Sequence, residues 1–303
     1  AIKWQMPRVD DRIKLLGKRM IPGMIGAGVY QINLLIDTML ASLVSDGAVS
    51  WLYYADRVQQ LPLGVIGIAI GTALLPTLSR QLQGDDAKTA MYSQNRGIEI
   101  ALLLTLPAAV ALGVMGLPVI NVLFERGAFG AEETLMTGMA LTVFAFGLPA
   151  SVLVKVLAPG FFAREDTKTP IRIGISCMVL NIILIVVLMP WFGHLGIAAA
   201  TSVSVWVNAM SLGIILHRRG DLTFDARLTR RVPRILLASA LMGSALWFAI
   251  DAFWQNDALS ITRIITMAIC VGGGMAVYAI SAQLLGATSF SELKSTLKRG
   301  KPA

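Results

Sequence analysis

The stretch SWLYYADRVQQLPLGVIGIAIGTALLP, residues 50–76, decides the fold class. It is long enough to cross a membrane, because a helix of about 20 residues spans the hydrocarbon core. It nevertheless carries Asp56 and Arg57 about two turns from its start. A charge inside a bilayer is costly, so such residues usually face a cavity, water or a protein partner. The stretch therefore indicates a helix of a membrane protein with a polar interior.

The whole chain has the composition of an all-α, polytopic membrane protein. Of its 303 residues, 55% are hydrophobic and only 15% are charged, whereas about 25% of residues in a soluble domain are charged. Short alternating segments typical of a membrane β-barrel are not visible. The long apolar blocks predict eight transmembrane helices, at about 20–44, 51–76, 98–120, 134–158, 171–190, 195–216, 235–254 and 264–285.

Lysine and arginine mark one side of the membrane. Twenty-two of them lie in alternate connections, and only Arg126 and Arg263 lie in the connections of the opposite side. Cytoplasmic loops attract basic residues, so we expect both ends of this chain in the cytoplasm. This distribution explains the net charge of +8 without a nucleic-acid partner. The basic segments are 1–19, 79–96, 159–172, 217–234 and 287–303.

Polar side chains follow one face of the helix predicted at 51–76. Tyr53, Arg57 and Gln60 are spaced i, i+4 and i+7, which places them on one stripe. Arg57 lies ~10 Å inside the span at 1.5 Å per residue. A guanidinium binds phosphate oxygens with two parallel hydrogen bonds, so we predict that Arg57 contacts an anionic substrate. The alternative is a structural ion pair with Asp37 or Asp56.

A second polar set lies at a similar depth on other helices. Asp37 is ~12 Å inside the first span, and Asn181 and Thr201 lie about as deep in the fifth and sixth spans. Their oxygen atoms are suitable ligands for a hard cation such as sodium. Hydrogen bonding between helices is the alternative use of these side chains. The sequence leaves both interpretations open.

No motif indicates an enzyme. The chain lacks a cluster of metal-ligand residues, a nucleophile–base set and a phosphate-binding glycine loop, so we expect neither catalysis nor a cofactor or metal. Cys177 and Cys270 lie in apolar blocks and do not predict a disulfide framework. Because the sequence starts at Ala1, we expect a fragment or one piece of a longer polypeptide.

Four stretches together resemble one known family: QINLLIDTMLAS (31–42), the stretch at 50–76, FERGAF (124–129) and AREDTKTPIRI (163–173). They are similar to the MurJ/MviN lipid II flippases of the multidrug/oligosaccharidyl-lipid/polysaccharide exporter superfamily, and the resemblance covers nearly the whole chain. Family members have two six-helix lobes followed by two further helices. The resemblance implies that this chain is the second lobe plus the extra pair, with the N-terminal lobe as its missing partner on the same polypeptide or a second chain.

The resemblance also implies a division of the chain. Residues 1–19 would be a cytoplasmic amphipathic segment, 20–216 the C-terminal lobe and 217–234 a basic linker. Residues 235–285 would be a two-helix element with a groove for a lipid tail, and 286–303 a basic cytoplasmic tail. The run Gly272, Gly273 and Gly274 fits that groove.

The activity that the resemblance implies is transfer of lipid II across the bacterial cytoplasmic (inner) membrane. Arg57 matches the family's essential arginine on this helix, and Tyr53, Asp56 and Gln60 would join it in binding substrate. Gln60 stands where some members have a glutamate. Asp37, Asn181 and Thr201 would fit coupling of transport to a cation, either sodium or a proton, or to the membrane potential. A related exporter of drugs or of another polyprenyl-linked oligosaccharide is the alternative.

Overall fold

The computed structural model describes residues 28, 31–254 and 260–288, and this part of the chain is almost entirely helical. The expected amphipathic segment 1–19 and most of the tail lie outside the described residues. The predicted all-α class is confirmed, and within the described residues the only β-type pairing is an isolated bridge between Arg126 and Phe129. Seven of the described helices are long and apolar enough to cross a membrane. The eighth expected span, 20–44, is described only in part and is helical over 31–42.

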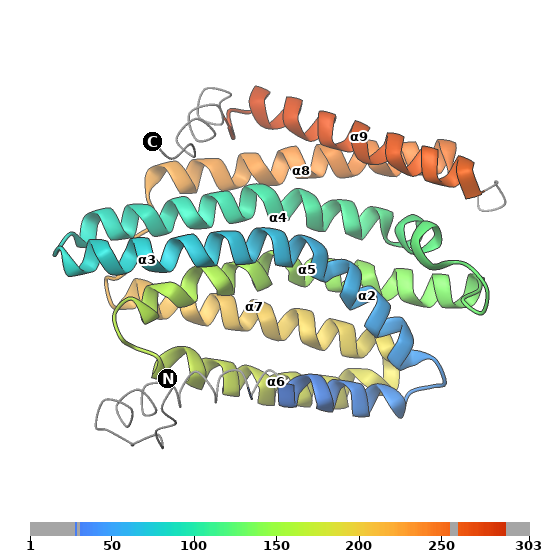
Figure 1. The fold of residues 1–303 in the computed structure, drawn as a ribbon, viewed down its shortest axis with the longest axis horizontal. Helices are drawn as coiled ribbons and strands as arrows, with labels where there is room; N and C mark the ends of the chain where they lie inside the picture. Colours follow the sequence, from blue (N-terminus) through green and yellow to red (C-terminus); the bar gives the residue numbers. More distant parts are fainter. Residues whose placement is uncertain (1–27, 29–30, 255–259, 289–303) are drawn as a thin grey trace, which may run out of the picture.

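The first labelled span is built from three consecutive helical segments, and six long helices follow it (Figure 1). The segments are α2 (Ala48–Pro62), η1 (Leu63–Ile68) and α3 (Ala69–Gln83), and the later helices are α4 (Ala87–Phe124), α5 (Ala131–Phe162), α6 (Lys168–Phe192), α7 (His194–Arg218), α8 (Ala226–Phe253) and α9 (Ser260–Leu284).

The helices run roughly side by side, with α5 near the centre (Figure 1). Helix α5 packs mainly on α4 and α7, while α6 packs on α7 and the α8–α9 pair packs on α4. The turns at 84–86, 163–167 and 219–225 lie together at the left end of Figure 1. We call this the basic end, because these turns fall within the segments rich in lysine and arginine.

Several helices extend well past the spans that hydropathy predicts. Helix α4 has 38 residues and is therefore ~57 Å long, whereas the hydrocarbon core is only about 30 Å thick. The segment 79–96, expected as a connection, is helical except for the turn at 84–86. Likewise α8 begins at Ala226, inside the segment 217–234 that we expect as a linker. Hydropathy detects only the part of a helix that lies in lipid.

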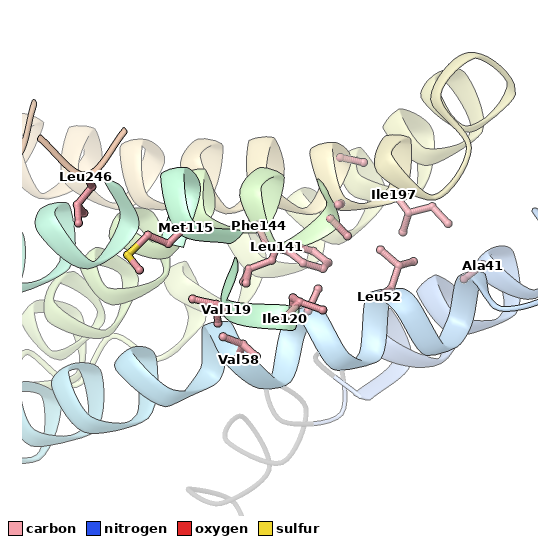
Figure 2. Close-up of a cluster of buried hydrophobic side chains, with 14 of the residues drawn as sticks. Ala41, Leu52, Val58, Met115, Val119, Ile120, Leu141, Phe144, Ile197 and Leu246 are labelled. Carbon is pink, nitrogen blue, oxygen red and sulfur yellow. The ribbon is translucent and has the colours of Figure 1, made fainter. Parts of the chain in front are cut away.

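The core at the end opposite the basic end is formed by small and branched side chains from several helices (Figure 2). Ile120, Leu141 and Ile197 are almost fully buried there. Helices α4 and α5 approach closely, since an added Cβ at Gly116 would lie 2.8 Å from the carbonyl oxygen of Gly138. Small residues at crossings allow such approach in membrane bundles.

Pro62 interrupts the second span as expected, but the chain does not leave the helical state. Residues Leu63–Ile68 form a π-helix, and the helix then continues as α3. Proline removes one backbone hydrogen bond, and a π-helical turn is one way to absorb that loss. The G-x-x-x-G face also packs closely as predicted, because an added Cβ at Gly67 would lie 2.6 Å from Cδ of Lys155 on α5.

Candidate functional site

A cavity of about 560 Å³ collects the polar side chains that sequence analysis singled out. Its walls come from the helical stretch 31–42 and from α2, α5 and α7. We call it the polar cavity. All four predicted substrate-binding residues line it, together with two of the three predicted cation ligands: Tyr53, Asp56, Arg57, Gln60, Asp37 and Thr201.

Arg57 lies at the wall of the polar cavity and is held by its own helix. Its Nη1 donates to Oε1 of Gln60 at 3.1 Å, and Nε2 of Gln60 donates in turn to Oδ2 of Asp56. The guanidinium also lies over the ring of Tyr53, 4.7 Å from the ring centre, a cation–π contact. The predicted stripe on this helix is therefore a chain of side-chain contacts that orients the arginine.

The structural ion pair that we kept as the alternative for Arg57 is not formed. Within the described residues, neither Asp37 nor Asp56 lies in a salt bridge with its guanidinium. A guanidinium has five N–H donors, and the contact with Gln60 uses one of them. The remaining donors are available for an anion that enters the cavity.

Asp37 belongs to a separate group of oxygen-bearing side chains. Its Oδ1 accepts from Nδ2 of Asn181 at 2.9 Å, and its Oδ2 accepts from Nδ2 of Asn33 at 3.0 Å. The hydroxyl of Thr201 lies close to the same carboxyl group. The predicted trio therefore comes together in space. Sequence analysis missed Asn33, although it precedes Asp37 by four residues and so shares its helix face.

One oxygen in this group has no partner in the described part of the chain. Asn181 is only 2% exposed, and its Oδ1 accepts no hydrogen bond there. A buried polar atom without a partner costs about 1–3 kcal/mol, so it calls for an explanation such as an ion or a water molecule. Ile185, one turn beyond Asn181, is fully buried and adds no oxygen.

The glycine run of α9 lies away from the polar cavity. An added Cβ at Gly274 would lie 3.0 Å from Cδ2 of Leu246, so this glycine allows α9 to approach α8. Gly272 and Gly273 have nothing within 4 Å of an added Cβ. Both glycines are exposed on α9, and neither borders the polar cavity.

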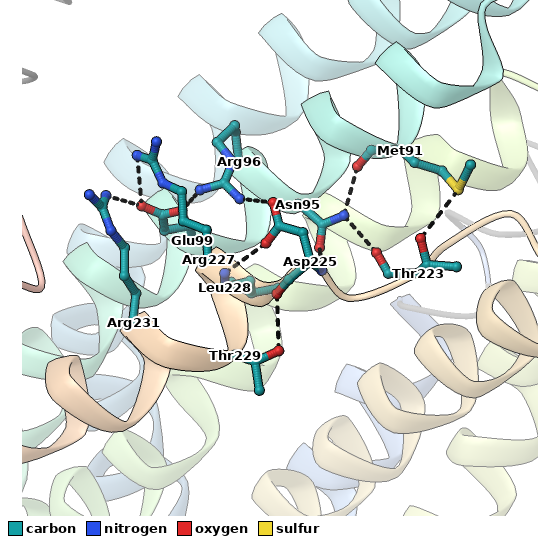
Figure 3. Close-up of polar contacts among 10 residues, drawn as sticks. All are labelled: Met91, Asn95, Arg96, Glu99, Thr223, Asp225, Arg227, Leu228, Thr229 and Arg231. Carbon is teal, nitrogen blue, oxygen red and sulfur yellow. Dashed lines mark hydrogen bonds and ion pairs between the residues drawn. The ribbon is translucent and has the colours of Figure 1, made fainter.

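A buried ionic cluster ties α8 to α4 at the basic end (Figure 3). Glu99 on α4 is paired with Arg96, Arg227 and Arg231, and its side chain is only 7% exposed. Arg96 also pairs with Asp225, which caps α8 through the backbone N–H of Leu228 at 2.7 Å. This cluster was not predicted, because its partners are about 130 residues apart in the chain.

A second contact fixes the α8–α9 pair at the other end of the molecule. Arg263 on α9 donates to Oδ1 of Asn121 at 3.1 Å and pairs with Glu125 at 3.3 Å. The extra helices are therefore anchored to α4 at both ends.

Together the fold and the polar cavity define one lobe of a polytopic helical membrane transporter. The body is a multi-pass bundle, and polar groups from three helices and the stretch 31–42 meet inside it. Comparison with known proteins then identifies the family. The sequence profile described as "Lipid II flippase MurJ" matches residues 2–268, and the chain belongs to that family.

Relatives and solved structures agree with this assignment. The "Probable lipid II flippase MurJ" of Rhizobium meliloti (strain 1021) is 44% identical over 100% of this chain and 57% of its own length. That of Vibrio cholerae serotype O1 is 39% identical over 93% of this chain and 53% of its own length. The structure "Lipid II flippase MurJ, inward closed conformation" matches with a TM-score of 0.73 and 26% identity, over 90% of this chain and 55% of that one.

More distant solved structures share the fold alone. An outward-facing multidrug resistance MATE transporter of the MOP superfamily matches with a TM-score of 0.58 and 20% identity, over 87% of this chain and 62% of that one. The chain spans about half the length of the curated relatives it matches.

Proposed function

We propose that the protein carrying this chain moves lipid II from the inner to the outer leaflet of the bacterial cytoplasmic membrane. The observation that carries the proposal is Arg57, an exposed guanidinium at the wall of the polar cavity with no carboxylate paired to it among the described residues. Lipid II contains a pyrophosphate, which suits such a donor. The relatives that bear this name provide the second line of support.

The proposed mechanism is alternating access between this lobe and an N-terminal one. Arg57 binds the pyrophosphate, with Tyr53, Asp56 and Gln60 orienting the guanidinium and the sugar end of the substrate. The α8–α9 pair holds the isoprenoid tail along the surface around Gly272–Gly274. Rocking of one lobe against the other then carries the headgroup across, as in other transporters with repeated halves. The protein acts by transport and makes or breaks no covalent bond.

The group around Asp37 supports a coupling cation. A carboxylate, two amide side chains and a hydroxyl form a donor set suited to sodium, and the unpartnered Oδ1 of Asn181 is the atom that a cation would satisfy. A proton on Asp37 is the other candidate. In either case binding would favour one conformation and so drive the return step. We place the basic end in the cytoplasm by the distribution of lysine and arginine.

The test replaces Arg57 with alanine or lysine in a strain depleted of its own flippase. The Arg57→Ala variant is expected to abolish growth even though the variant protein reaches the membrane in normal amount. Arg57→Lys is expected to restore growth only partly, because an ammonium group lacks the two parallel N–H donors of a guanidinium. Arg172→Ala is the matched control, since Arg172 is exposed on α6 outside the polar cavity. Leaflet-specific detection of lipid II provides the direct readout.

Two results would contradict the proposal. Normal growth of the Arg57→Ala strain would remove the role of the guanidinium. Unchanged lipid II in the outer leaflet of depleted cells, with loss of a different polyprenyl-linked sugar, would assign the protein to a related exporter.

A further inference from the structure

A second cavity, distinct from the polar cavity, lies between α7 and α8. Its volume is about 720 Å³ and it shares no lining residue with the polar cavity. Apolar side chains from α4, α5, α7 and α8 form its walls, among them Leu102, Leu157, Trp206 and Val232. Its mouth carries His217 and Arg218 at the basic end. We call it the leaflet cavity.

The dimensions of the leaflet cavity fit the hydrocarbon of one leaflet. Along α7 it extends from Trp206 to Arg218, which is ~18 Å at 1.5 Å per residue. One leaflet contributes about 15 Å, half of the ~30 Å hydrocarbon core. The apolar walls and this length therefore suit the acyl chains of lipids in one leaflet.

The mouth of the leaflet cavity carries a positive charge with no counter-charge. Two neighbouring arginines are engaged, since Arg219 pairs with Asp166 at 2.7 Å and Arg164 with Asp221 at 2.9 Å. Arg218 is exposed and makes no ion pair with any described residue. Basic residues beside an apolar site at the membrane surface are typical of binding to anionic lipid headgroups.

The loop at the mouth is held in place rather than left free to fill the cavity. Nδ1 of His217 lies 3.0 Å from the carbonyl oxygen of Leu222, and the His217 ring stacks on Phe224 at 5.9 Å between centroids. Leu222 is fully buried beneath it. The loop 219–225 is therefore fixed against the end of α7, and Phe224 is part of the cavity wall.

We infer that the leaflet cavity is a binding site for an anionic phospholipid of the membrane, with an acyl chain against Trp206 and Val232 and the phosphate at Arg218. The lipid would fill the space between the six-helix lobe and the α8–α9 pair. It is separate from the transported substrate, because the cavity lies apart from Arg57 and extends through one leaflet only.

The test uses Trp206 as a built-in reporter. Purified protein is placed in bilayers in which a minor lipid carries bromine on its acyl chains, either phosphatidylglycerol or phosphatidylcholine in equal amount. Bromine quenches tryptophan at contact distance, and subtracting a Trp206→Phe variant isolates this residue from the other tryptophans. We expect stronger quenching by the anionic lipid. The affinity of the site for phosphatidylglycerol should exceed that for phosphatidylcholine by about fivefold, because one basic residue contributes about 1 kcal/mol to anionic lipid binding.

Two variants with matched controls separate the charge from the cavity. Arg218→Gln is expected to remove the preference for the anionic lipid, while Arg172→Gln on α6 keeps it. Gly213→Leu is expected to reduce quenching by both lipids, because Gly213 lines the cavity and an added Cβ there meets only Leu157 at 3.8 Å. Gly174→Leu, which has nothing within 4 Å of an added Cβ, keeps the quenching of the unmodified protein.

The same measurements define what overturns the inference. Equal quenching by the two lipids in the unmodified protein would mean ordinary solvation by bulk lipid. Unchanged quenching in the Gly213→Leu variant would mean that no chain enters the cavity. Relief of quenching by undecaprenyl phosphate, but not by unbrominated phosphatidylglycerol, would assign the cavity to the tail of a polyprenyl lipid instead.

Discussion

Replacing Glu99 by glutamine is expected to destabilise the protein by about 3 kcal/mol. The carboxylate is 7% exposed and is the shared partner of Arg96, Arg227 and Arg231. Removing one member of a buried ionic group costs about 3–5 kcal/mol, because the remaining charges stay buried without a partner. We take the lower end, since the Arg227 side chain is 39% exposed and solvent screens its contribution.

The free energy of unfolding in mixed micelles measures this effect. Asp251→Asn is the control, because Asp251 is exposed on α8, at the end away from the Glu99 cluster. Such surface changes usually alter stability by no more than ±0.5 kcal/mol. Combining Glu99→Gln with Arg231→Gln should recover part of the loss, which a double-mutant cycle detects. A loss below about 1 kcal/mol for Glu99→Gln would refute the view that this cluster anchors α8 to α4.

Three further predictions concern packing, pH and the cation. Gly138→Val should lower stability by about 1–3 kcal/mol in the same unfolding assay, because an added Cβ there would lie 2.9 Å from the backbone of α4; an unchanged midpoint would contradict the close crossing. In the turn at the basic end, burial alone would raise the pKa of Asp166, but hydrogen bonds from Thr169 and Arg219 outweigh it and lower the pKa to about 2. Since the folded pKa is below the unfolded value of about 3.9, ionised Asp166 stabilises the folded protein above pH ~4, and this stabilisation is lost between pH ~4 and ~2. Asp166→Asn should remove about 1 kcal/mol of the pH dependence of stability after screening. An identical pH profile for the variant and the unmodified protein would contradict this prediction. If the coupling ion is sodium, added sodium should raise the melting temperature of the unmodified protein, and if it is a proton, the melting temperature should depend on pH. Asp37→Asn should abolish whichever effect is present. Absence of both effects in the unmodified protein would reject a coupling cation.

The sequence predicted what depends on local periodicity and composition. Hydropathy located the spans because each crosses the same thickness of lipid, and the spacing of Tyr53, Arg57 and Gln60 was enough to place them on one face. The structure brings these side chains to one cavity. Asn33 was within reach of the same reasoning, because it lies one turn before Asp37 and shares its face.

The features that sequence reasoning missed depend on contacts between distant segments. The cluster around Glu99 joins residues about 130 positions apart, and in the sequence Arg227 and Arg231 look like ordinary basic residues near a membrane surface. The leaflet cavity is formed by four helices, none of which shows it alone. Pro62 predicted a break in the helix, but proline chemistry does not specify that the chain continues through a π-helical turn.

The π-helical segment Leu63–Ile68 determines the direction in which the Arg57 side chain points around the helix axis. A π-type turn contains a surplus residue relative to a regular α-helix, and each residue advances the helix by about 100°. Leu63–Ile68 separates Arg57 from Gly71, where an added Cβ would lie 3.4 Å from the carbonyl oxygen of Lys155, so this glycine marks the contact of α3 with α5. Deleting one residue between them would leave the α3 contact in place and swing the guanidinium by about 100°, away from the wall it now shares with Asp37.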